Sequence, residues 1–338
     1  MGSYPDTVNL LEYLRSRSSV DCDCLDTQVA TTLGPFVDCT SNQADAYLEL
    51  LTPKRTSLLK KSAALAREIL SDFTGVSYEE LAVEISMVNL SLAVAPLITG
   101  VIHVMSNPLL DATPAIVDNA KRIVSLCSRL EPGFDTSRLC IKIVSTWEGL
   151  QACHQLSSIG INTLATTLFT MEQAVLAAEA GCVYVSPFVH ELKAFFDETY
   201  QDEGPILGHC LQIQQYYERY SYRTRVKAAG LLTADEAMRL AGVTSLTLAP
   251  ALVHTLSKSE DSKKEVEALS LFKQGSESQG QASERLSLID DEIKFRTAFA
   301  KSEGGKGQLK TMQAIDIFRQ YQIKAESLMR DEDVARSE

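Results

Sequence analysis

The sequence predicts a single (β/α)8 barrel that spans residues 1–338. Short runs rich in apolar and β-branched residues alternate along the chain with longer helical patterns. The short runs are apolar on both faces, as in a parallel sheet that is covered by helices. Eight such runs favour closure of the sheet into a barrel.

The strand candidates are residues 20–23, 36–41, 98–105, 139–145, 161–169, 182–189, 224–229 and 245–249. The helix candidates between them are residues 43–73, 114–129, 147–159, 171–181, 206–222 and 234–241.

The last third of the chain changes in composition. Residues 257–285 are rich in Ser, Lys, Glu, Gly and Gln, so we expect a polar, flexible insertion with one or two helical turns at 265–272 and a loop at 274–281. Within residues 286–338, the segments 289–299 and 309–329 are amphipathic, which predicts helices that pack on the barrel exterior or over its mouth.

The net charge of −12 argues against a nucleic-acid or membrane-surface partner, since either would need a basic face. No basic region followed by an apolar stretch marks a signal peptide, so we expect a cytoplasmic protein. The apolar segment 81–104 is interrupted by Glu84, Asn89 and Pro96, which favours a buried helix and strand over a membrane span.

The eight cysteines are scattered, and several lie in apolar runs. Cys22 and Cys24 are separated by one residue, whereas zinc knuckles and redox motifs use two. We therefore expect reduced core thiols and no metal site.

Lys142 lies in the middle of an otherwise apolar strand. Burial lowers the pKa of lysine towards the neutral amine, which can attack a carbonyl group and form an iminium (Schiff base). An iminium makes the cleavage and formation of the neighbouring carbon–carbon bond accessible. The alternative is a lysine at a strand end that extends to solvent.

Polar side chains on other strands are candidates for the same site. Asp21 and Asp23 share one face of the first strand, either towards the barrel interior or at a solvated strand end. Asn42 follows the second strand, where it could contact substrate or cap a helix. His103 lies mid-strand, where it could transfer protons or be a satisfied core residue.

Thr166 and Ser186 could supply hydroxyl groups at strand tips. The chain contains no GxxxxGK[ST] phosphate loop, no HExxH metal motif and no GxSxG elbow that would indicate another chemistry.

The segment 141–149, Ile-Lys-Ile-Val-Ser-Thr-Trp-Glu-Gly, resembles the motif around the Schiff-base lysine of the transaldolase family. The likeness continues through residues 161–173, 177–181, 185–189, 216–220 and 240–250. It implies a (β/α)8 barrel, often dimeric, that needs no metal or organic cofactor.

The resemblance also implies roles for individual residues. Lys142 matches the lysine that forms the covalent intermediate, and Asp23 matches the catalytic aspartate of the first strand. Thr166 matches the threonine that helps to hold a catalytic water, while Asn42 and Ser186 match substrate-contacting positions.

Other family positions are changed in this chain. His103 aligns with the catalytic glutamate of the third strand, and Leu164 aligns with an asparagine. Glu191 and Leu232 align with the two arginines that grip the sugar phosphate, and Gly230 aligns with a nearby serine. The resemblance therefore implies that the residues for Schiff-base chemistry are kept and that the arginines that bind the phosphate are lost.

We predict an enzyme that forms a Schiff base at Lys142 and catalyses aldol-type chemistry on a small carbonyl substrate other than a sugar phosphate, in specialised metabolism. Asp23 and His103 would share proton transfers, with a water held by Thr166. Two alternatives stay open. One is an ordinary transaldolase of the pentose phosphate pathway that uses Lys227 or Arg225 as replacement cations. The other is a non-catalytic binding protein.

Overall fold

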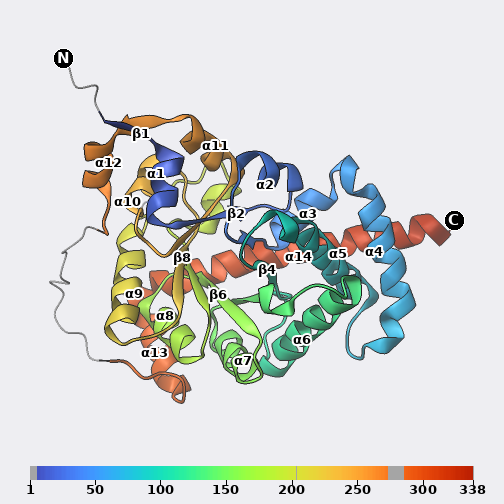
Figure 1. Ribbon diagram of the computed structural model, residues 1–338. Coiled ribbons are helices and arrows are strands. Elements are labelled where there is room, and N and C mark those ends of the chain that lie inside the picture. Colours follow the sequence, from blue (N-terminus) through green and yellow to red (C-terminus); the bar gives the residue numbers. More distant parts are fainter. Residues whose placement is uncertain (1–5, 203, 273–284, 338) are drawn as a thin grey trace.

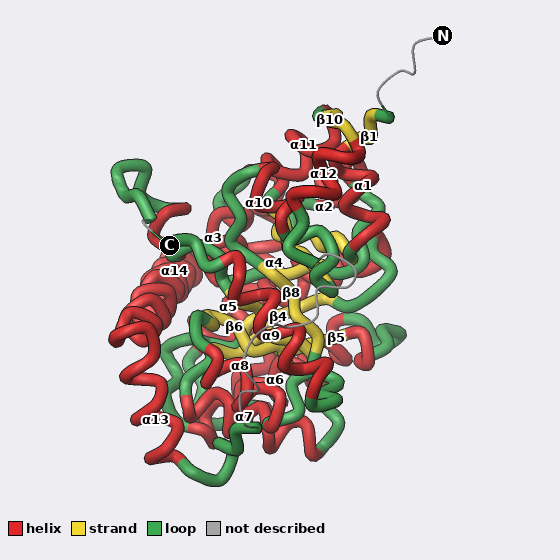
Figure 2. The backbone as a smooth tube through the Cα atoms, turned by 90° about the vertical axis from the view of Figure 1, so that its left-hand side faces the viewer, coloured by secondary structure: helices red, strands yellow, loops and turns green. Residues whose placement is uncertain are grey.

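The computed structural model describes residues 6–202, 204–272 and 285–337, and within them eight parallel strands close into a barrel in chain order. Helices surround the strands on the outside (Figures 1 and 2). The predicted (β/α)8 barrel is thus confirmed. Its strands are β2 (Ser19–Asp23), β3 (Cys39–Thr40), β4 (Ile102–Met105), β5 (Leu139–Val144), β6 (Asn162–Leu168), β7 (Tyr184–Pro187), β8 (Arg225–Ala228) and β9 (Ser245–Leu248).

Every predicted strand corresponds to a barrel strand, although most strands are shorter than their apolar runs. At β3, for example, Phe36 makes only an isolated bridge to Ile98 before the regular pairing at Cys39 and Thr40. An apolar run therefore locates a strand but overestimates its length.

The helices of the barrel are α1 (Leu10–Arg17), α2 (Thr27–Leu33), α3 (Gln43–Leu50), α4 (Thr56–Ile69), α5 (Tyr78–Val94), α6 (Thr113–Leu130), α7 (Trp147–Ser158), α8 (Met171–Glu179), α9 (Leu207–Arg219), α10 (Ala234–Arg239) and α11 (Pro250–Lys258). Short 3-10 turns are η1 (Pro53–Arg55), η2 (Leu70–Asp72), η3 (Ala95–Leu97), η4 (Thr136–Arg138) and η5 (Leu192–Phe195).

The prediction of one helix over residues 43–73 was wrong. The chain makes α3, the turn η1 and then α4, with Pro53 at the first position of η1. Proline has no backbone N–H and clashes with the preceding turn, so it ends α3 and allows the chain to change direction.

Helix α5 carries the most apolar part of the chain. By length and composition, the segment Tyr78–Leu97 could cross a membrane, but 67% of the 18-residue apolar window within it is buried inside the protein. Its one buried acid, Glu84, accepts hydrogen bonds from Arg122 Nε (2.7 Å) and Asn119 Nδ2 (2.5 Å) on α6. These contacts identify α5 as a core helix, and the predicted buried helix and strand over residues 81–104 are confirmed.

The region expected to be a flexible insertion is partly ordered. Strand β10 (Glu260–Ser262) pairs antiparallel with β1 (Thr7–Asn9), and α12 (Lys263–Leu269) follows it. Pairing with the N-terminal strand supplies the backbone hydrogen bonds that the composition gave no reason to expect. The predicted loop at 274–281 lies outside the described residues.

Both predicted C-terminal helices are present, as α13 (Glu292–Lys301) and α14 (Lys306–Ser337), with the turn η6 (Ser302–Gly305) between them. Helix α13 packs against α7 and α8 on the exterior. Helix α14 packs against α3, α5 and η5, and it crosses the molecule from the side of α8 to that of α4 (Figure 1). Helix α13 thus packs on the barrel exterior and α14 lies over the barrel mouth, the two placements that were expected.

Candidate active site

A cavity lies where the carboxyl ends of the barrel strands meet α14. It has a volume of about 410 Å³ when the part that opens to solvent is included. Active sites of (β/α)8 barrels form at this face. The lining residues are Asp23, Thr40, Asn42, Lys142, Ser186, Phe188, Leu192, Phe195, Ala229, Gly230, Thr247 and Phe318.

Lys142 reaches the cavity from the middle of β5 and is only 4% exposed. Its register neighbours are Met105 on β4 and Leu164 on β6. No ion pair of Lys142 occurs within the described part of the chain. Burial lowers the pKa of Lys142, although the charges of Asp23 and Asp45 oppose the shift. The geometry thus favours the neutral amine that nucleophilic attack requires.

Asp23, the last residue of β2, lines the same cavity. Its Oδ1 accepts a hydrogen bond from Thr40 Oγ1 at 2.7 Å, which fixes the orientation of the carboxyl group. The structure therefore brings Asp23 and Lys142 together, as predicted. Thr40 was not predicted, and only the pairing of β2 with β3 places it there.

Asn42 lies at the cavity wall and also caps a helix. It lines the cavity, and its Oδ1 also caps α3 by accepting hydrogen bonds from the backbone N–H groups of Ala44 (2.8 Å) and Asp45 (3.1 Å). Its Nδ2 donates to Asp45 Oδ2 at 2.6 Å. A helix cap at the cavity wall thus holds the amide group in one orientation.

Asp45 is a second carboxyl group near Lys142 that the sequence analysis missed. Burial raises the pKa of Asp45 well above its usual value, and the negative charge of Asp23 raises it further, while Lys142 lowers it. Its position three residues after the cap Asn42 is the signal that could have found it.

Thr166 on β6 is buried, and its Oγ1 has no hydrogen-bond partner among the described residues. A buried hydroxyl without a partner is costly unless a water satisfies it. The next residue, Thr167, has a φ of 56°, which is unusual for a β-branched side chain. Its carbonyl oxygen accepts hydrogen bonds from Gln173 Nε2 and Thr311 Oγ1, both at 3.3 Å, so α14 helps to hold this strand end.

His103 does not line the cavity. It pairs in register with Cys140, one inward-facing level below Lys142, whereas Met105 occupies the level of Lys142. Its Nε2 lies 3.4 Å from Asp38 Oδ2. Burial lowers the pKa of His103 to about 4, so the ring is neutral at neutral pH. The structure therefore gives no support to proton transfer by His103, and it assigns this residue to the packing beneath the site.

Lys227 is the centre of a buried ion cluster beneath the cavity. Its Nζ donates to Asp21, to Asp38 Oδ2 (2.9 Å) and to Ser245 Oγ (3.1 Å). Burial alone would lower the pKa of Lys227, but the two carboxylates outweigh burial and raise it. Lys227 is thus a paired ammonium ion and is not free to bind phosphate.

Arg225 lies at the first position of β8, away from the carboxyl ends of the strands. Its guanidinium group stacks over the ring of Tyr184 and donates to the Tyr184 hydroxyl at 2.5 Å. Neither Arg225 nor Lys227, the two proposed replacement cations, lines the cavity.

Glu191 and Leu232, which the family resemblance places at the positions of the phosphate-binding arginines, do not line the cavity either. The carboxylate of Glu191 accepts hydrogen bonds from the Tyr200 hydroxyl and from Gln313 Nε2 (3.0 Å), and it lies 3.7 Å from Lys310 Nζ. Leu232 is 44% exposed. Glu191 therefore ties the loop after β7 to α14.

Of the other predicted site residues, some line the cavity and one does not. Ser186 lines the cavity, as does Gly230. Leu164 is fully buried and packs with Cys140 and Tyr184 in the barrel interior. The apolar lining residues Phe188, Leu192, Phe195 and Phe318 were missed. Leu192 and Phe195 on η5 and Phe318 on α14 reach the mouth only through tertiary packing, whereas Phe188 directly follows β7.

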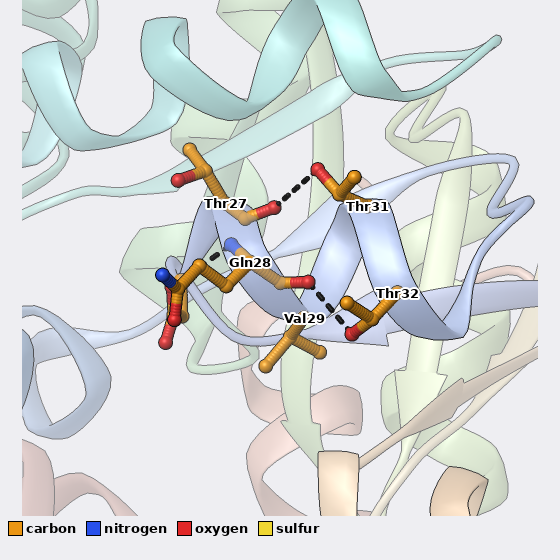
Figure 3. Close-up of a pocket in the computed structure, with 6 residues that line it drawn as sticks. Thr27, Gln28, Val29, Thr31 and Thr32 are labelled. Carbon is orange, nitrogen blue, oxygen red and sulfur yellow. Dashed lines mark hydrogen bonds between the residues drawn. The ribbon is translucent and has the colours of Figure 1, made fainter.

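A second depression lies on the outer surface at α2 (Figure 3). The hydroxyl groups of Thr31 and Thr32 donate to the carbonyl oxygens of Thr27 and Gln28, each at 2.8 Å. These groups are satisfied within their own helix, so the depression offers no reactive side chain.

Comparison with known proteins gives one consistent result. Residues 22–304 match the family described as transaldolase/fructose-6-phosphate aldolase. The chain belongs to this family. A transaldolase of Yersinia pseudotuberculosis is 34% identical over 230 residues, which cover 66% of this chain and 71% of the relative. A transaldolase of Alteromonas mediterranea is 33% identical over 260 residues, covering 74% and 79%.

Membership identifies the chain as an enzyme of the class I aldolase type, a transferase whose family mechanism uses a lysine Schiff base. The predicted family and class of enzyme are confirmed. The cavity around Lys142 is the place in the described chain where such chemistry fits.

We expect the His103→Gln variant to lose stability but keep its reaction with carbonyl compounds. Loss of the buried partner of Asp38 should lower the free energy of unfolding by about 1–3 kcal/mol, measured by urea denaturation. The rate of reductive trapping should stay within about twofold, because His103 is outside the cavity. The exposed His254→Gln variant is the control. A hundredfold slower trapping rate at unchanged stability would restore His103 as a proton carrier.

We expect the Asp45→Asn variant to react faster with carbonyl compounds at the pH values where Asp45 of the unmodified protein is ionised. Ionised Asp45 raises the pKa of Lys142, but burial raises the pKa of Asp45 itself, so the gain should disappear as the pH falls and Asp45 becomes protonated. The measurement is the rate of cyanoborohydride trapping over a pH series, with the exposed Asp235→Asn variant as control. An unchanged pH midpoint would show that Asp45 has no electrostatic influence on Lys142.

Proposed function

We propose that this enzyme forms a Schiff base between Lys142 and a carbonyl substrate that is not a sugar phosphate, and that it makes or breaks an aldol carbon–carbon bond. The observation that carries the proposal is the cavity itself. It places a buried lysine without an ion pair beside Asp23, and within the described chain it contains no other cationic side chain.

The reaction begins when the neutral Nζ of Lys142 attacks the carbonyl carbon of a ketone. The resulting carbinolamine loses water and becomes an iminium ion. Loss of a proton, or of an aldehyde, from the neighbouring carbon gives an enamine, because the iminium nitrogen accepts the electron pair. The enamine carbon can attack an aldehyde carbon, whose oxygen takes up a proton. Water then releases the product and regenerates the amine.

Asp23 is the residue that we assign to the proton transfers of this sequence. Its carboxyl group faces the cavity, and the hydrogen bond from Thr40 orients it. General acid–base catalysis by a positioned side chain contributes about 10²–10⁴-fold to a rate. Thr166 is not among the residues that line the cavity, but its buried hydroxyl has no partner in the described chain and is suited to hold the water that dehydration releases and hydrolysis consumes.

The preference against sugar phosphates follows from the missing cations. A hydrogen bond to a charged group contributes about 1.5–3 kcal/mol, and an arginine presents a bidentate fork of donors. Loss of two such groups would cost about 3–6 kcal/mol, or roughly 10²–10⁴-fold in affinity. Glu191 cannot replace an arginine as a phosphate ligand, because its carboxylate is negatively charged like the phosphate. The carboxylate also accepts hydrogen bonds from Gln313 and Tyr200.

A second candidate function is that of an ordinary transaldolase, which transfers a dihydroxyacetone unit between sugar phosphates in the pentose phosphate pathway. The similarity to relatives named transaldolase favours it. The burial of Lys227 and the position of Arg225 weigh against it. The reactive environment of Lys142 weighs against the non-catalytic binding protein.

The setting of the reaction is also part of the proposal. We place the enzyme in the cytoplasm and in specialised metabolism, as a small-molecule enzyme without a nucleic-acid or membrane partner. A homodimer and independence from metals and organic cofactors are what the family resemblance implies.

Replacement of Lys142 by alanine should abolish carbon–carbon chemistry and leave the fold intact. After incubation with dihydroxyacetone and borohydride, mass spectrometry should find the reduced adduct on Lys142 of the unmodified protein and no adduct in the variant. The Lys193→Ala variant is the control, since Lys193 lies near the mouth but not in the cavity. Full activity of Lys142→Ala would disprove the covalent mechanism.

Transaldolase activity with fructose 6-phosphate as donor and erythrose 4-phosphate as acceptor should be negligible. Within the described chain, the cavity has no arginine fork for the terminal phosphate. A coupled assay for released glyceraldehyde 3-phosphate measures the rate. A robust rate in the unmodified protein would promote the ordinary transaldolase over our proposal.

A further inference from the structure

The cavity has two chemically different halves. The half around Lys142 is polar and is formed by strand ends, with Asp23, Thr40, Asn42, Ser186 and Thr247. The half towards the mouth is apolar and is formed mainly by η5 and α14. Its residues are Phe188, Leu192, Phe195, Ala229 and Phe318.

The apolar half continues to the surface as aromatic side chains. Phe318 is fully buried at the inner end, and Phe195 is 38% exposed at the outer end. A ligand that extends outward from Lys142 therefore meets hydrocarbon surface.

The lysines near this mouth already have acidic neighbours. Lys310 Nζ lies 3.7 Å from Glu191, and Lys193 Nζ lies 3.5 Å from Asp197 and over the ring of Tyr200. These pairs reduce the positive potential that an anionic acceptor would need. The described mouth thus favours a neutral ligand.

We infer that the acceptor substrate is an aldehyde with a neutral aromatic or aliphatic substituent, which lies against Phe188, Leu192, Phe195 and Phe318. The inference rests on the proposed function and names the acceptor class of that same site. The polar half would hold a small hydroxyketone donor on Lys142. The enamine carbon then bonds to the aldehyde carbon, the aldehyde oxygen takes a proton, and the apolar substituent is unchanged.

The preference can be measured without catalysis. Calorimetry of the unmodified protein should give at least about tenfold tighter binding of 3-phenylpropan-1-ol than of glycerol 3-phosphate, because only the alcohol matches the apolar half. Equal binding, or tighter binding of glycerol 3-phosphate, would overturn the inference.

Two neighbouring phenylalanines provide a matched pair of variants. Phe195 lines the cavity, whereas Phe196 is similarly exposed (41%) but does not line it. Phe195→Ala should weaken binding of 3-phenylpropan-1-ol by about tenfold, as expected for loss of a ring contact, and Phe196→Ala by less than about twofold. Equal effects of the two variants would contradict the location of the apolar subsite.

A separate measurement distinguishes this inference from the proposed function. Reductive trapping of hydroxyacetone on Lys142 tests the Schiff base alone. If trapping fails while the alcohol binds as expected, the covalent chemistry is disproved and the apolar selectivity stands. If trapping succeeds, the unmodified protein should join hydroxyacetone to 3-phenylpropanal faster than to glyceraldehyde 3-phosphate, and the reverse order would refute the inference.

Discussion

Exclusion of water from the barrel interior is the constraint on which the site depends, and two buried lysines show its effect. Lys227 is surrounded by Asp21 and Asp38 and remains charged, because the carboxylates compensate for lost hydration. Lys142 lies higher in the same barrel without an ion pair in the described structure, and burial lowers its pKa. The same desolvation thus accompanies a paired ammonium ion in one place and a lysine with a lowered pKa in the other.

The two levels of the interior depend on each other. Asp38 contacts both Lys227 and His103, so the charged groups beneath the cavity interact with one another and not with the cavity. The carboxyl groups left to the upper level are Asp23 and Asp45, which are oriented by Thr40 and Asn42. Since neither forms an ion pair with Lys142, they adjust the protonation of the amine without neutralising it as a tight pair would.

Local sequence patterns were sufficient for the strands and for the buried position of Lys142, because apolar runs and a lone lysine are local signals. They were insufficient for His103, since strand register decides which side chain faces Lys142, and register places Met105 there. They also missed Asp45, Phe195 and Phe318. These residues reach the site through a helix cap, η5 and α14, whose positions are set by contacts between distant parts of the chain.

The proposed loss of phosphate binding and the apolar wall of the cavity involve the same loop and helix. The family resemblance places Glu191 at the position of an arginine, and its carboxylate accepts hydrogen bonds from Gln313 and Tyr200 and faces Lys310, which connects the loop after β7 to α14. That loop continues directly into Leu192 and Phe195, and α14 supplies Phe318. An arginine at position 191 would thus remove the carboxylate that holds the wall together. If the proposed function is correct, the packed loop and helix together set the specificity, and single side chains at the aligned positions do not determine it alone.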